Sequence, residues 1–147
     1  ELTEDTRFDD DLTYLNKALE LSKKEDKTTF EVKNNDIIKQ AINAHRMMSN
    51  VKKGVITGEA EVDNFITAGV RDLENAKALI LMSDGMAHPD FGKEETYIQA
   101  AKHMYKNSIE NYYQHIKSLF DGDKDGKNLK YLRCKHMDDA SAMVIHL

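Results

Sequence analysis

Cysteine and long apolar runs are scarce in this chain of 147 residues, and each shortage excludes a class of protein. Cys134 is the only cysteine, so no disulfide can form within the chain, and an intracellular, cytoplasmic location is expected. The longest apolar run is ALILM at 78–82, far short of the roughly 18 residues that a membrane-spanning helix needs. We therefore expect no membrane partner and no disulfide framework.

An excess of basic charge is also absent. The chain has 21 lysines and arginines against 26 aspartates and glutamates, which gives a formal net charge of -5. Binding to phosphate backbones needs clustered Lys and Arg, so nucleic acid is not an expected partner. The remaining composition, 40% apolar and 32% charged, predicts a single domain over residues 1–147 with a real core.

The spacing of apolar residues predicts both helices and strands. Three- and four-residue steps indicate helices over 9–25, 36–50 and about 93–120, the last being long and carrying the strongest pattern. Alternating or continuous apolar runs indicate strands over 55–57, 64–73, 77–82 and 140–147, and a short strand or extended lead-in over 27–33. Because strands follow one another in the middle with no helix between them, we expect an α+β fold, an antiparallel sheet flanked by helices.

The stretch LFDGDKDGKNLKYL at 119–132 opens like a calcium loop. Asp121, Asp123 and Asp125 alternate and Gly126 follows, as in the first half of an EF-hand. The position that should carry a bidentate glutamate is Leu132, however, so the half of the loop that closes on the ion is missing. The pattern favours a solvated turn over an EF-hand, and weak calcium binding at 121–132 stays an open alternative.

Carboxylates also stand at the ends of two expected strands. Asp84 and Gly85 directly follow the apolar run at 78–82, and Asp138 and Asp139 directly precede the terminal strand. Glycine there would let backbone or ligand approach closely. Strand-end aspartates that meet at one sheet edge are the pattern of a metal site, although SDG taken alone also suits an ordinary turn.

Four segments in order give the chain a resemblance to a known family. They are LTED at 2–5, GVITGE at 54–59, ALILMSDGM at 78–86 and KYLRCKHMDDASAMVIHL at 130–147. Together they resemble the protein phosphatase 2C family, the metal-dependent serine/threonine phosphatases. The resemblance implies a β-sandwich flanked by helices, of which this chain would form half or part, and a phosphoprotein substrate in a signalling role.

The resemblance also implies site residues and cofactors. Two Mn²⁺ or Mg²⁺ ions would share a water that attacks the phosphorus, with Asp84 and Asp138 among their ligands. Asp5 would help Asp84 to hold a third, weaker ion. Gly85 would contribute backbone, and Asp139 would lie beside the metal rather than on it.

The family's N-terminal motifs are not present before residue 5. We therefore expect the C-terminal part of such a catalytic domain, not active by itself, with its exposed sheet covered by an N-terminal segment or a second copy. The alternative is a non-catalytic regulatory or binding module that kept a degenerate phosphatase fold. The histidines show no ligand spacing, so zinc is not expected, and His88 is interpreted as a loop residue near the site.

Overall fold

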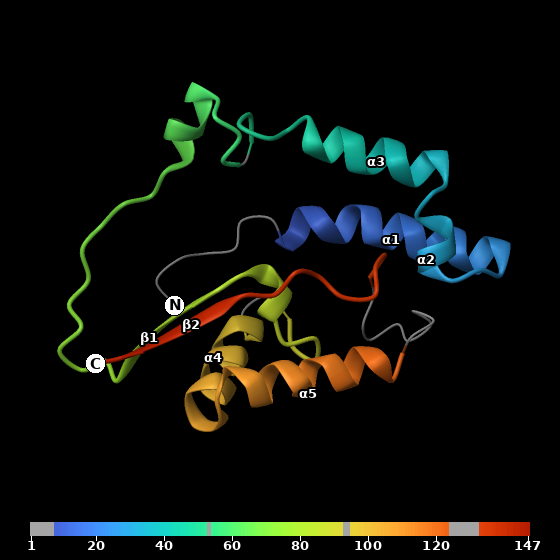
Figure 1. Ribbon diagram of the computed structural model, residues 1–147. Helices are drawn as coiled ribbons and strands as arrows, with labels where there is room; N and C mark the ends of the chain where they lie inside the picture. The colour runs from blue at the N-terminus through green and yellow to red at the C-terminus, as the bar shows by residue number, and fades with distance from the viewer. Residues whose placement is uncertain (1–7, 53, 93–94, 124–132) are drawn as a thin grey trace.

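The computed structural model describes residues 8–52, 54–92, 95–123 and 133–147 (Figure 1). Helices and a small antiparallel sheet make the fold α+β, as the sequence predicts. In chain order the elements are α1 Phe8–Glu25, α2 Thr29–Val32, α3 Asp36–Arg46, the 3-10 turn η1 Ala60–Phe65, β1 Ala78–Met82, the 3-10 turn η2 Asp84–Met86, α4 Thr96–Asn107, α5 Ile109–Asp121 and β2 Ala142–His146.

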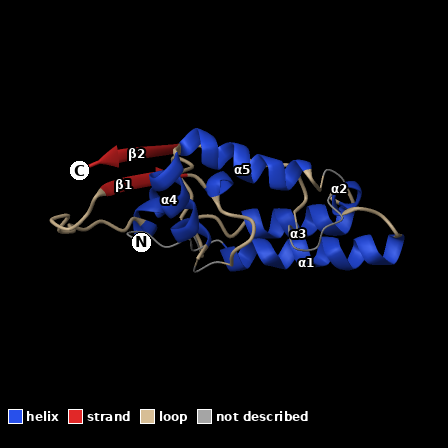
Figure 2. Ribbon diagram, turned by 90° about the horizontal axis from the view of Figure 1, so that it is seen from below, coloured by secondary structure: helices blue, strands red, loops and turns tan. Residues whose placement is uncertain are grey.

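Two groups of elements make up the molecule. In both views the sheet lies at one end, and α1, α2 and α3 lie toward the other (Figures 1 and 2). Ala18, Val32 and Ile38 form the buried core of the α1–α3 group. A second core lies beneath the sheet, where α4 and α5 pack; its buried members are Met86, Ala100, Met104, Tyr112 and Ile116.

The predicted helices at 9–25 and 36–50 are confirmed as α1 and α3. Lys23 and Lys24 in the last turn of α1 match the helix dipole. Asn35 caps α3, because its side chain accepts the Ile37 N–H at 2.9 Å. Asp36 is therefore the first residue of that helix rather than its cap.

The short strand or extended lead-in expected over 27–33 is wrong, because Thr29–Val32 in its centre form the short helix α2. Thr28 and Glu31 make a capping box: the Thr28 hydroxyl accepts the Glu31 N–H at 3.2 Å, and the Glu31 carboxylate accepts the Thr28 N–H at 2.7 Å. These reciprocal bonds satisfy donors that a helix start leaves open. They outweigh the weak strand preference of the β-branched residues.

The central strands over 55–57 and 64–73 are also not formed; the chain there makes η1 and irregular backbone. The side chains of Ile66 and Val70 are 65% and 92% exposed. Within the described residues, a strand here would therefore gain little stability from side-chain packing. Of the predicted middle strands only 77–82 is confirmed, as β1. The described residues thus form a two-stranded sheet, and no β-sandwich is seen among them.

β1 and β2 pair antiparallel in a register that runs from Ala78 opposite His146 to Met82 opposite Ala142. This confirms the expected terminal strand and its pairing direction. Alternate residues, Ile80, Met82, Ala142 and Val144, pack on the core of α4 and α5. On the other face Leu81, Met143 and Ile145 are 51%, 57% and 41% exposed.

The long helix predicted over about 93–120 is two helices, broken at Ser108. Ser108 has φ 108° and ψ 159°, which no helix can contain, and its hydroxyl accepts the Asn111 N–H at 3.2 Å to cap α5. The two amphipathic stretches on either side follow one apolar pattern, so periodicity alone does not reveal the break. The break lets α5 fold back against α4 under the sheet.

Candidate functional site

The antiparallel register brings the SDG and DDAS segments together at one end of the sheet. Ser83 follows β1 and Ser141 precedes β2, so the two serines are neighbours across the ladder. The Ser83 N–H donates to the Ser141 carbonyl at 2.9 Å, and the Ser141 N–H donates to the Ser83 hydroxyl at 3.0 Å. The expectation that these strand-end segments share one sheet edge is therefore met in the backbone.

Gly85 lies directly against the backbone of the DDAS segment. A Cβ added at Gly85 would collide with the Asp139 carbonyl, lying 2.8 Å from its carbon and 3.2 Å from the Ala140 Cα. No other residue type fits here without moving one of the two segments. Close backbone approach, one of the two roles expected for a glycine after the strand, is thus its role in the structure.

The carboxylates at this end are exposed. Asp84 Oδ1 accepts the Gly85 N–H at 3.0 Å, and Asp138 Oδ1 accepts the Asp139 N–H at 2.9 Å. Asp138 also forms an ion pair with Lys135, whose Nζ lies 2.5 Å from Oδ1. Each acidic side chain is thereby oriented by its own local backbone, within one or two residues of the point where the segments touch.

Carboxylate oxygens are the donors that Mg²⁺ and Mn²⁺ prefer, so the chemistry of Asp84 and Asp138 fits such an ion. Within the described ranges, no group of three or more His, Cys, Asp or Glu side chains is placed so that it could hold a metal ion. These ranges thus supply carboxylates at the strand ends rather than a full set of ligands. Asp5, the third ligand expected from the sequence, lies outside the described residues.

The turn that carries Asp84 is anchored to the helices beneath it. The Met86 side chain is buried, and its carbonyl accepts the Tyr112 hydroxyl of α5 at 2.9 Å. Two residues further on, the His88 carbonyl accepts the Thr96 hydroxyl at 3.0 Å, at the start of α4. The loop after β1 is therefore tied to both helices.

Three histidines without ligand spacing in the sequence lie close together, and two of them, His88 and His103, contact the Tyr112 ring. The ring centroids of His88 and His115 are 5.5 Å apart, and those of His103 and His115 are 5.2 Å apart. Burial lowers the pKa of His103, and the nearby His115 lowers it further. The sequence pattern of each element does not predict this cluster, because the histidines meet only when α5 folds back against α4 at Ser108.

The calcium-like stretch is engaged in ion pairs at its start. The Asp121 carboxylate accepts a hydrogen bond from the Lys117 ammonium at 2.8 Å, and it lies 3.0 Å from Nε2 of His136. The Asp123 carboxylate forms an ion pair with the Arg133 guanidinium at 2.7 Å. The first two carboxylates of the supposed calcium loop thus face cations of the protein itself. The rest of that loop, 124–132, lies outside the described residues.

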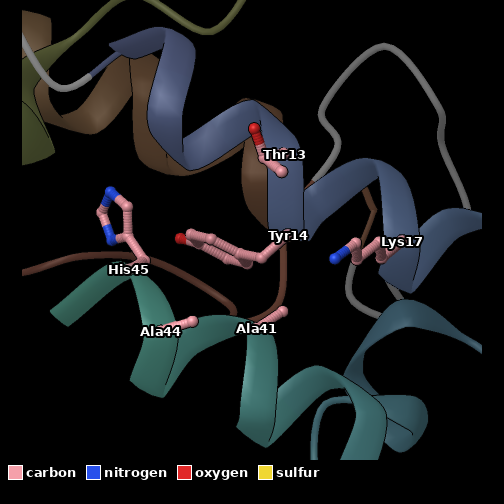
Figure 3. Close-up of a pocket in the computed structure, with 6 residues that line it drawn as sticks. All are labelled: Thr13, Tyr14, Lys17, Ala41, Ala44 and His45. Carbon is pink, nitrogen blue, oxygen red and sulfur yellow. The ribbon is translucent and has the colours of Figure 1, made fainter. Parts of the chain in front are cut away.

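A shallow groove of about 210 Å³ lies between α1 and α3 (Figure 3). The Tyr14 hydroxyl points toward the His45 ring, with the two ring centroids 6.3 Å apart. The lining residues are Thr13, Tyr14, Lys17, Ala41, Ala44 and His45. With no carboxylate among them, this groove does not suit a hard divalent cation.

No family of proteins, no curated protein and no solved structure matches this chain. Among the described residues, no helix has both the length and the apolar character needed to cross a membrane. What the protein does is therefore inferred from its own residues and their geometry.

Proposed function

We propose that the chain is the C-terminal part of a metal-dependent phosphoserine and phosphothreonine phosphatase of the 2C type. The observation that carries this proposal is the direct contact of the SDG and DDAS segments, with Gly85 against the Asp139–Ala140 backbone. In a phosphatase of this type, both segments must reach one site. The SDG and DDAS segments are more than 50 residues apart in the sequence, and they are joined by a hydrogen bond between Ser141 and Ser83. This contact supports the proposal of a shared site.

In this proposal Asp84 and Asp138 ligate the paired ions, and Asp5 joins Asp84 at a third. Bound Mn²⁺ or Mg²⁺ would lower the pKa of a coordinated water and neutralise the phosphoryl oxygens of the substrate. Asp139 supports the site through its backbone, since its carbonyl lies against Gly85. The chain's own contribution is to hold these exposed carboxylates at one end of its sheet.

The exposed apolar face of the sheet belongs to the same proposal. Leu81 and Met143 are more than half exposed on neighbouring strands. Solvent-facing apolar residues on a two-stranded sheet favour a covering layer. We propose an N-terminal segment of the catalytic domain as that layer, with a second copy of the chain as the other occupant to test.

One observation favours a non-catalytic module instead. The Lys135 ammonium forms an ion pair with the Asp138 carboxylate. A lysine at that distance supplies the positive charge that a metal ion would otherwise bring. In this alternative the chain keeps the fold as a regulatory or binding module, and Lys135 stands in for the lost ion.

The first experiment compares Mn²⁺-dependent hydrolysis of a simple aromatic phosphate ester by the wild-type chain, Asp84→Asn and Asp138→Asn. Asp63→Asn, in the exposed turn η1, is the matched control because it removes the same charge away from the sheet end. Turnover that requires Mn²⁺ and is lost in the two site variants alone would support the phosphatase.

Mn²⁺ binding followed by electron paramagnetic resonance separates the remaining outcomes. Binding without turnover, weakened by Asp84→Asn, would fit a catalytic part that needs the rest of its domain. Absence of binding in wild type together with binding in Lys135→Ala would favour the module in which Lys135 replaces the ion. Absence of binding in every variant would contradict the metal site itself.

A further inference from the structure

The Tyr112 hydroxyl reaches from α5 into the turn that carries Asp84. It donates to the Met86 carbonyl at 2.9 Å, and the tyrosine is completely buried. Burial raises the pKa of Tyr112 well above its ordinary value, so the hydroxyl keeps its proton and remains a donor at every physiological pH. The bond joins residues 26 positions apart in the sequence.

The accepting carbonyl belongs to the last residue of the η2 turn. Within that turn the Met86 N–H donates to the Ser83 carbonyl at 3.0 Å, and the Ala87 N–H donates to the Asp84 carbonyl at 2.9 Å. A buried carbonyl that loses its donor carries a desolvation penalty, so the backbone would move to find another partner. Because Met86 and Asp84 belong to the same three-residue turn, a backbone shift at Met86 would also displace Asp84.

The turn is held from two sides. On its outer side Gly85 touches the Asp139 backbone, and on its inner side Met86 is bound by Tyr112. The tyrosine ring is itself fixed, because its centroid lies 5.2 Å from that of His103 on α4 and 5.9 Å from that of His88. The position of the hydroxyl is therefore set by both helices.

We propose that Tyr112 is a positioning residue, which fixes the backbone of the Asp84 turn from helix α5 through its hydrogen bond to the Met86 carbonyl. The proposal rests on the function proposed above, in which Asp84 holds a metal ion. It makes the α4–α5 pair part of the metal site, although neither helix supplies a ligand. The chemical step would not involve the tyrosine itself.

Tyr112→Phe tests the proposal because it removes one hydroxyl and keeps the buried ring. Tyr113→Phe is the matched control: the neighbouring tyrosine is half-buried on the same helix and packs against the same core. The first measurement is amide hydrogen exchange, which needs no metal. Exchange of the Met86 and Ala87 amides should become about tenfold faster in Tyr112→Phe, with little change in Tyr113→Phe.

The second measurement is Mn²⁺ affinity, taken at a temperature where all variants remain folded by circular dichroism. Affinity should fall about tenfold in Tyr112→Phe and stay near the wild-type value in Tyr113→Phe. A purely structural role would lower the melting temperature without moving the affinity. Affinity unchanged in Tyr112→Phe would therefore overturn the proposal.

The exchange data keep the inference separate from the proposed function. If wild type binds no Mn²⁺, the proposed metal site is contradicted. Faster exchange in Tyr112→Phe confined to residues 84–87 would still support the role of Tyr112 in fixing the backbone of the turn. Exchange that is unchanged at Met86 and Ala87 would overturn it. Exchange that rises equally across the whole chain would also overturn it, because it would report only a loss of global stability.

Discussion

The guanidinium of Arg133 lies 2.7 Å from the carboxylate of Asp123, and both side chains are nearly buried, at 11% and 9% exposed. The same guanidinium donates to the Asp123 carbonyl at 2.6 Å and to the His136 carbonyl at 2.9 Å. Its Cζ also lies over the rings of Phe30 and Phe120, 5.3 and 4.9 Å from their centroids. Arg133 thus connects α2, the end of α5 and the segment that leads to Asp138.

Replacing Arg133 should strongly destabilise the fold. Arg133→Ala removes the guanidinium from a nearly buried ion pair, and losing one member of such a pair costs about 3–5 kcal/mol of the free energy of unfolding. Arg133→Lys should recover little of this stability, because an ammonium lacks the several donors and the flat face that the guanidinium presents to its partners. Urea unfolding of both variants measures this, and a loss below about 1 kcal/mol in Arg133→Ala would contradict it.

Calcium should leave the protein unchanged. Asp121 and Asp123 already pair with Lys117 and Arg133, and Asp121 also contacts the His136 ring, so an ion entering there would have to displace these protein groups. Millimolar Ca²⁺ should shift the melting temperature by less than about 1 °C, because a ligand stabilises only when it binds the folded state. A rise of several degrees with Ca²⁺ but not with Mg²⁺ would restore the calcium interpretation of 121–132.

Gly85→Ala should damage the sheet end more than any ordinary glycine replacement. The added methyl meets the Asp139 carbonyl and forces the two segments apart, at a cost of about 1–3 kcal/mol in the free energy of unfolding. Gly69→Ala is the control, because an added Cβ there meets nothing within 4 Å. Denaturant unfolding of the two variants compares them. Equal stabilities would show that the contact at Gly85 yields without cost.

His103 should make the fold less stable in mild acid. Burial lowers its pKa in the folded state, so below the unfolded value of about 6.5 the unfolded chain binds more protons. The stabilising contribution of His103 is fully present above the unfolded pKa. It is lost as the pH falls from there through the lower pKa of the folded state. The drop in melting temperature between pH 7 and 5 should shrink in His103→Gln. His146→Gln, at an exposed strand end, is the control and should keep the wild-type drop.

The predictions that were confirmed depend on strong local patterns. The amphipathic spacing of α1 and α3, with suitable charges at their ends, needs no distant contact to specify a helix. The apolar runs of β1 and β2 also stand out locally. Once these two strands pair antiparallel, the segment after one and the segment before the other must lie side by side.

The errors arise where a short polar signal opposes an apolar pattern, or where an alternating pattern has no neighbour to pack against. Thr28 and Glu31 convert a strand-like stretch into a helix through a capping box. Ser108 divides a continuous apolar face into two helices because it caps the second one. Residues 64–73 alternate as a strand should, but no described neighbour covers Ile66 or Val70, and alternation alone does not hold a strand.

Local sequence patterns are enough to place Asp84, Gly85, Asp138 and Asp139 at strand ends, because these residues directly follow or precede apolar runs that form strands. Which polar atoms bond to each other inside the molecule depends on tertiary packing. Tyr112 bonds to Met86 across 26 residues, and Arg133 bonds to Asp123 across 10. A buried donor must have an acceptor, but the packing of helices and sheet in space selects which acceptor it reaches.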